Sequence, residues 1–185
     1  MVHALLDASI RVLEREGMGA FNTNRVAQVA GVSVGSLYQY FANKEALVAG
    51  VVERGVLAAE DQVRSLMGSE LPHDELLEAL LHGVVNELLP FRRLIAELLA
   101  SGPMLSRMGI FPILEPRLMD ACRDYLLSRS GTVRVIGGPA ALYVAVSCAI
   151  FAVLKWLAEQ PRHVPQDALV GAVKRQLLAH VAPTT

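Results

Sequence analysis

A short stretch near the N-terminus concentrates side chains that form hydrogen bonds. Residues 33–44 include two serines, two tyrosines, a glutamine and a lysine. A glutamine amide can make two hydrogen bonds to the edge of an adenine, whereas hydroxyl groups and a lysine are suited to phosphate oxygens. The chemistry that these residue types favour is therefore recognition of a nucleic acid by hydrogen bonding.

Two short helices must position these side chains. Asn22 is suited to cap a helix over residues 23–30, and Ser33 is suited to cap a second helix over residues 34–41. The intervening turn, Gly31-Val32-Ser33, contains a glycine. This arrangement is typical of a helix-turn-helix, whose second helix enters the major groove of DNA.

The second of these helices has one apolar face and one polar face. At about 100° per residue, Leu37 and Phe41 lie together and should pack inward. The opposite side then carries small and polar residues, namely Gly35, Ser36, Tyr38 and Gln39. Val34 lies only about 60° from Leu37, so it is a candidate for the core as well as for the exposed face.

The rest of the chain predicts an all-α protein. Of the 185 residues, 53% are hydrophobic, and the apolar positions recur at spacings of three and four, as amphipathic helices require. We expect a three-helix DNA-binding domain over residues 1–46 and a helical effector-binding and dimerisation domain over residues 47–185. The expected helices cover residues 3–16, 23–30, 34–41, 44–66, 74–89, 91–101, 116–130, 139–159 and 165–182, with Gly17 as a stop signal, Asn43 as a cap and an irregular stretch from 102 to 116.

Catalysis finds no support in the residue pattern. The five histidines and the two cysteines, Cys122 and Cys148, have no metal-ligand spacing, and no phosphate-binding loop or nucleophile elbow occurs. We therefore expect neither an enzyme nor a cofactor or metal site. The polar stripe Glu75, Glu78, His82 and Asn86 is expected to face solvent.

One segment raises the alternative of a membrane span. Residues 135–154 carry no charge, and 20 residues is the length that a span needs. However, Gly137-Gly138-Pro139 places the helix start near Pro139, so the uncharged part of the helix would rise only about 24 Å. A buried interface helix is therefore favoured over a membrane-attached helix.

The N-terminal motifs resemble those of the TetR (tetracycline-repressor) family. The resemblance covers about residues 5–50 and rests on Phe21-Asn22-Thr23-Asn24-Arg25-Val26-Ala27, on Ala30-Gly31-Val32-Ser33-Val34-Gly35-Ser36-Leu37-Tyr38-Gln39-Tyr40-Phe41 and on Asn43-Lys44-Glu45-Ala46-Leu47. It implies contacts to DNA from Asn22, Thr23, Ser33, Val34, Gly35, Ser36, Tyr38, Gln39, Tyr40 and Lys44. The chain departs from the family pattern because no Lys or Arg precedes Arg11, whereas members usually carry a basic arm there.

The resemblance also implies a homodimer that binds a palindromic operator, with two recognition helices about 34–36 Å apart. The apolar residues of the last two predicted helices would form the dimer interface. The predicted interface residues are Leu142, Val146, Ile150, Val153, Leu157, Leu169, Val173 and Leu177.

The resemblance finally implies an effector pocket in the C-terminal domain. Methionines and aromatic residues adapt to varied ligands, although any one of them could equally be core. The candidate lining residues are Phe91, Met104, Met108, Phe111, Met119, Cys122, Tyr125, Tyr143, Ser147 and Phe151.

The sequence thus predicts a cytoplasmic DNA-binding transcriptional regulator. The favoured form is a dimeric repressor that a small, largely apolar effector releases from its operator. An effector-independent regulator, or an activator, would share residues 1–50 but need no pocket. A membrane-attached helical protein is the third alternative.

Overall fold

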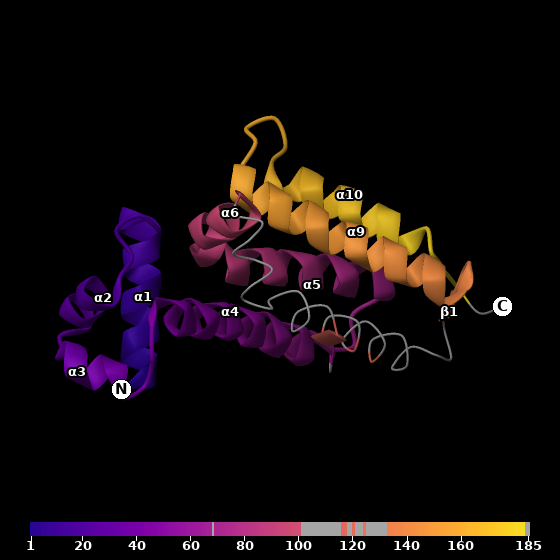
Figure 1. Cartoon of the computed structure of the whole chain (residues 1–185). Coiled ribbons are helices and arrows are strands. Elements are labelled where there is room, and N and C mark those ends of the chain that lie inside the picture. Colours follow the sequence, from indigo (N-terminus) through magenta and orange to yellow (C-terminus); the bar gives the residue numbers. More distant parts are fainter. Residues whose placement is uncertain (68, 101–115, 118–119, 121–123, 125–132, 184–185) are drawn as a thin grey trace.

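The computed structural model describes residues 1–67, 69–100, 116–117, 120, 124 and 133–183. Figure 1 shows the N-terminal helices gathered at one end of the molecule and the later helices bundled at the other, joined by α4. The N-terminal elements are α1 (Val2–Glu16), α2 (Thr23–Ala30), α3 (Val34–Tyr38) and α4 (Lys44–Met67). The later helices are α5 (His73–Leu88), the 3-10 helix η1 (Leu89–Phe91), α6 (Arg92–Ala100), α9 (Gly138–Glu159) and α10 (Gln166–Leu178).

The predicted capping residues are confirmed as the start and stop signals of the N-terminal helices. The Asn22 side chain accepts a hydrogen bond from the Arg25 amide at 2.8 Å, and the Ser33 hydroxyl accepts one from the Ser36 amide at 3.0 Å. Asn43 does the same for the Ala46 amide at 2.8 Å. Gly31 closes α2 with a φ of 72°, a left-handed conformation that glycine adopts without strain.

The N-terminal helices share one hydrophobic core. Leu5, Phe21 and Leu37 are at most 1% exposed and belong to the same buried cluster. Leu94 and Leu98 of α6 belong to that cluster too, although they lie more than 40 residues further along the chain. Helix α6 therefore shares the core of the N-terminal helices and packs against α1.

A second core lies between α5, α6, α9 and α10. Val85, Leu157 and Val173 are buried there, and Ile95 of α6 packs against them. Figure 1 shows α9 and α10 side by side along the bundle. The indole of Trp156 on α9 donates to the carbonyl of Val164 at 2.7 Å and so fixes the loop that leads into α10. Helix α6 thus contributes residues to both cores.

The expected all-helical fold is confirmed, with two local corrections. Helix α3 ends at Tyr38 rather than at residue 41, and α10 ends at Leu178 rather than at 182. Beyond α10, strand β2 (Val181–Pro183) pairs antiparallel with β1 (Val133–Val135). Pairing with a distant segment replaces the last helical turn that local periodicity predicts. Most of the helix expected over 116–130, and nearly all of the irregular stretch before it, lies outside the described residues.

The polar stripe of α5 does not face solvent alone, because α10 packs beside it. Glu78 accepts a hydrogen bond from Lys174 at 2.6 Å, and Asn86 accepts one from Gln166 at 2.9 Å. The ring of His82 also lies 3.4 Å from the Gln166 amide. Glu75, Glu78 and Asn86 are exposed, as expected of a solvated stripe, whereas His82 is half-buried beside α10.

Among the described residues, α9 is the one helix long and apolar enough to cross a membrane by length and composition. Only 28% of its most apolar 18-residue window is buried inside the protomer. Part of an apolar helix therefore stays uncovered in the isolated chain.

Candidate nucleic-acid interface

Helix α3 presents one face to the core and the other to solvent. Leu37 is fully buried, and Phe41 packs half-buried against the same cluster. Tyr38 and Tyr40 are 51% and 49% exposed, and Gln39 is exposed at the C-terminal end of the helix. A short helix anchored by Leu37 therefore projects two phenols and an amide away from the protein.

Gly35 leaves the centre of this face open. A Cβ atom built on Gly35 would find the Ser33 Oγ, at 3.8 Å, as its nearest neighbour. The protein itself has room for a side chain here, so packing does not require a glycine. A close approach of DNA to the α3 backbone would require one.

Three predicted DNA contacts at the start of α3, Ser33, Val34 and Ser36, also have contacts within the protein. Besides capping α3, the Ser33 hydroxyl lies 2.8 Å from the Ser36 hydroxyl, which fixes both side chains. Val34 is half-buried against the N-terminal core. The geometry therefore favours the core role of Val34 over the base contact that the resemblance implies.

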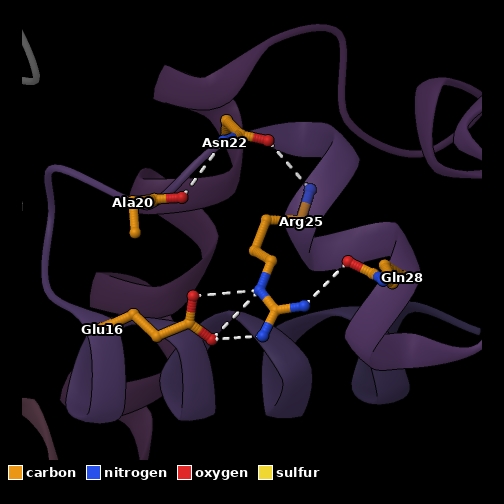
Figure 2. A network of polar contacts seen from close by, with 5 residues as sticks. All are labelled: Glu16, Ala20, Asn22, Arg25 and Gln28. Carbon is orange, nitrogen blue, oxygen red and sulfur yellow. Dashed lines mark hydrogen bonds and ion pairs between the residues drawn. The ribbon is translucent and has the colours of Figure 1, made fainter.

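The N-terminus of α2 lies next to α3. The hydroxyls of Thr23 and Tyr38 are 3.2 Å apart, so α2 and α3 hold one exposed pair of hydroxyl groups. The side chain of Asn22 caps α2 through its oxygen and donates to the Ala20 carbonyl at 3.1 Å (Figure 2), which fixes its orientation. Asn22, Thr23 and Tyr38 therefore gather exposed polar groups at the start of α2.

Lys44 is held in place at the start of α4. Its ammonium group donates to the Met18 carbonyl at 3.4 Å and lies 5.8 Å from the centre of the Phe21 ring. These contacts limit the motion of a long side chain, and a positioned cation loses less entropy when it binds a phosphate.

An ion pair fixes α2 against α1. Figure 2 shows the Arg25 guanidinium between Glu16 and Gln28. Its Nε donates to both Glu16 oxygens at 3.0 and 2.9 Å, its Nη2 donates to Glu16 at 2.7 Å, and its Nη1 donates to Gln28 at 2.7 Å. Hydrogen bonding to Arg25 lowers the pKa of Glu16, and the same contact raises the pKa of Arg25.

This shift predicts that acid weakens the attachment of α2. A lowered pKa means that Glu16 stabilises the folded state above its ordinary pKa of 4.5 and loses that contribution as the pH falls through the lower, folded value. We expect Glu16→Gln to lower the free energy of unfolding slightly at pH 7 and to make no difference well below pH 4. Urea unfolding across this range checks the effect, with Glu53→Gln, an exposed glutamate of α4, as the control. If the difference in the free energy of unfolding between Glu16→Gln and the wild type stays constant with pH, this prediction is contradicted.

The predicted dimer residues lie mostly inside the protomer. Val146, Val153 and Leu157 of α9 are buried, as are Leu169 and Val173 of α10. Leu142, Ile150 and Leu177 are half-buried. The assignment of the five buried residues to a dimer interface is therefore corrected, because they are covered within the protomer. The assignment of the three half-buried residues stays a prediction.

A different face of α9 is exposed. Tyr143, Val144 and Phe151 are 47%, 57% and 56% exposed, and Cys148 lies between them on the same side. Val144, Cys148 and Phe151 are spaced by four and three residues and so form one helical stripe, with Tyr143 at its edge. Sequence periodicity missed this stripe because α9 is apolar on all sides, and only the exposure separates its two faces.

The predicted pocket residues are not brought together by the described part of the chain. Tyr143 and Phe151 belong to the exposed stripe, Ser147 is half-buried beside them, and Phe91 packs against the N-terminal core and Gly55. The assignment of Tyr143 and Phe151 to an internal pocket is therefore a second correction. The remaining candidates, Met104, Met108, Phe111, Met119, Cys122 and Tyr125, lie outside the described residues.

A helix-turn-helix with an exposed polar recognition face, carried by a helical domain, defines the class of DNA-binding regulators. Residues 5–51 match the family described as bacterial regulatory proteins, tetR family. This match covers the helix-turn-helix and the start of α4, and it supports a TetR-family regulator; members of that family are transcriptional regulators. None of the curated proteins matches the chain.

Solved structures share the fold over nearly the whole chain. FadR of Thermus thermophilus, a TetR-family repressor in complex with lauroyl-CoA, is 20% identical, with a TM-score of 0.67 over 96% of this chain and 93% of that one. FadR of Bacillus subtilis in complex with stearoyl-CoA is 16% identical, with a TM-score of 0.69 over 97% and 98%. A TetR-family regulator of Streptomyces coelicolor is 22% identical, with a TM-score of 0.64 over 96% and 95%. At these identities the likeness establishes the fold.

Proposed function

We propose that the chain is a cytoplasmic dimeric repressor that binds a palindromic operator through α3 and is released by a small, largely apolar effector. The observation that carries this proposal is the exposed face of α3. Gly35 has no side chain there, so DNA could approach the helix backbone closely next to Tyr38 and Gln39. Gln39 and Ser36 would contact base edges. Thr23, Tyr38, Tyr40 and Lys44 would contact phosphates.

The uncovered stripe of α9 supports the dimer. Val144 and Phe151 are large apolar residues that lose contact with water when a second copy packs on them. Exposed Ala168 and Ala172 on α10 would allow a close helix contact beside them. We infer a four-helix interface formed by α9 and α10 of both protomers, on the face opposite to the one that periodicity predicted.

The position of α6 supports a coupling between effector and DNA. Leu94 and Leu98 pack into the core of the helix-turn-helix, while Ile95 packs into the core of the bundle. The Arg92 guanidinium also lies 3.7 Å from the Glu14 carboxylate of α1. A ligand that displaces α6 would therefore move α1, so residues 47–185 would act as the effector-binding unit and residues 1–46 as the DNA-binding unit.

The similarity to two FadR proteins with bound acyl-CoA makes an acyl chain our first candidate for the effector. We expect lauroyl-CoA to weaken binding of the dimer to its operator at least about fivefold, the lower end of usual allosteric coupling. Fluorescence anisotropy of a labelled operator duplex, titrated with lauroyl-CoA, measures this. Free CoA is the control. Operator affinity that does not change with saturating lauroyl-CoA would reject the acyl effector but leave DNA binding intact.

A further inference from the structure

Helix α1 carries two carboxylates on the side that meets α4 and α6. Asp7 and Glu14 are seven residues apart, so they lie within about 20° of each other around the helix axis. The Nη1 atom of Arg54 on α4 lies 2.5 Å from the Asp7 carboxylate. The Nη1 atom of Arg92 on α6 lies 3.7 Å from the Glu14 carboxylate. Each ion pair therefore joins the proposed DNA-binding unit to the proposed effector-binding unit.

Both guanidinium groups have a second constraint. The Arg54 Nη1 atom is shielded from solvent, and the Arg92 Nη1 atom also donates to the Leu89 carbonyl of η1 at 3.2 Å. The four side chains of the two pairs are nevertheless 36–47% exposed. Ion pairs as exposed as these add little to the stability of a protein. Their placement across the boundary between two units favours a role in orientation instead.

A close apolar contact lies directly beside the two ion pairs. Gly55 follows Arg54 on α4, and Phe91 precedes Arg92 at the end of η1. A Cβ atom built on Gly55 would lie 3.4 Å from two atoms of the Phe91 ring, so the glycine lets this ring rest against α4. Six residues thus form one junction between α1, α4 and the start of α6, namely Asp7, Glu14, Arg54, Gly55, Phe91 and Arg92.

We propose that Arg54 and Arg92 are positioning residues for DNA binding, which fix the angle of α1 relative to α4 and α6. Helix α3 shares the core of α1, so it follows that angle. This inference rests on the proposed function, because the angle matters when the two recognition helices of a dimer must meet half-sites about 34–36 Å apart. A variable angle would cost affinity for the full palindrome, whereas one helix-turn-helix can still align with a single half-site.

The experiment is a charge-exchange cycle on the full-length protein, with Glu14→Arg, Arg92→Glu and the double variant. Fluorescence anisotropy measures binding to the selected palindrome and to a duplex that contains one half-site. We expect each single variant to weaken binding to the palindrome roughly 2- to 30-fold, the usual effect of a residue that modulates coupling, and to leave the half-site affinity unchanged. The double variant should recover most of the loss. Asp7→Arg with Arg54→Asp is a second cycle with the same expectation.

The sign of the single-variant effects separates positioning from charge. An added cation strengthens binding to the phosphate backbone, so Glu14→Arg would bind both duplexes more tightly if the pair acted through charge alone. Arg93→Glu, at the exposed neighbour of Arg92, is the matched control and should not change the ratio of the two affinities. Effects that add in the double variant, or equal losses on both duplexes, would overturn the proposal.

A measurement without DNA separates this proposal from the proposed function. Spin labels at Arg11→Cys on α1 and Arg64→Cys on α4, both exposed positions, report the distance between the two units in a chain whose own two cysteines are replaced by serine. Dilution with unlabelled protein isolates the distance within one protomer. We expect a narrow distance distribution in the parent chain and in the exchanged double variant, and a broader one in Glu14→Arg.

The two kinds of readout can disagree. If the distance distribution behaves as expected but the wild-type protein selects no palindrome, the junction stands and the repressor assignment falls. If all variants share one distance distribution, the positioning role falls, and operator binding by the wild-type protein is unaffected.

Discussion

Replacing Phe151 with glutamate is expected to turn the proposed dimer into a monomer and to reduce operator affinity roughly 100- to 10,000-fold, the usual gain from linking two binding units. Phe151 is 56% exposed in the protomer, so a charged side chain there meets water and leaves the fold intact. In the dimer the same charge would be buried against an apolar partner surface, which is strongly unfavourable. Sedimentation velocity and operator binding by the same sample check both effects.

Leu57 offers a matched control for this variant. It is also a large apolar residue, 45% exposed, but it lies on α4 rather than on the α9 stripe. Leu57→Glu should leave the sedimentation coefficient and the operator affinity unchanged. If Phe151→Glu remains dimeric, the stripe of Tyr143, Val144, Cys148 and Phe151 is not the interface.

Replacing Gly35 with leucine is expected to abolish specific DNA binding while leaving the protein at least as stable. Beyond its chain neighbours and the backbone of its own helix, the nearest atom to a Cβ at Gly35 is the Ser33 Oγ at 3.8 Å, and Gly35 is exposed, so the protein leaves room for a side chain that points to solvent. Leucine also favours a helix by about 0.5–1 kcal/mol over glycine. The added bulk would hold α3 away from the groove and cost roughly 10- to 100-fold in affinity for each base contact that is lost.

In a thermal melt, Gly35→Leu should therefore keep or raise the melting temperature. In an anisotropy titration, the same variant should lose affinity for the operator. Ala49→Leu, at an exposed position of α4, adds comparable bulk outside the recognition face and should affect neither measurement. Unchanged operator affinity of Gly35→Leu would mean that α3 does not approach DNA through this face.

The helix-turn-helix was predictable because its signals are local. Asn22, Ser33 and Asn43 cap helices through amides three residues away, and Gly31 closes α2 in a conformation that glycine favours. The recognition face then follows from the position of Leu37 alone. Helix periodicity does not assign Val34 to either face, because this residue lies at the boundary between them. In the structure Val34 packs against the core.

The C-terminal half was less predictable because its arrangement depends on distant contacts. Helix α9 is apolar all round, so periodicity does not tell whether Val153 or Phe151 faces the protomer, and the packing of α5, α6 and α10 decides it. Similarly, a polar stripe that looks solvated meets Lys174 and Gln166 once α10 docks. The pairing of β2 with β1, which replaces the end of α10, joins segments about 48 residues apart and leaves no local signal.

The most direct test of the account is selection of duplexes from a randomised pool by the wild-type protein, repeated with Tyr38→Ala and Gln39→Ala. We predict a palindrome with half-sites about one helical turn apart, or a multiple of this distance. Tyr38→Ala should weaken all sequences alike, and Gln39→Ala should relax one position in each half-site. Failure to enrich any sequence above non-specific binding at moderate salt would contradict the assignment of α3 as a DNA-reading helix.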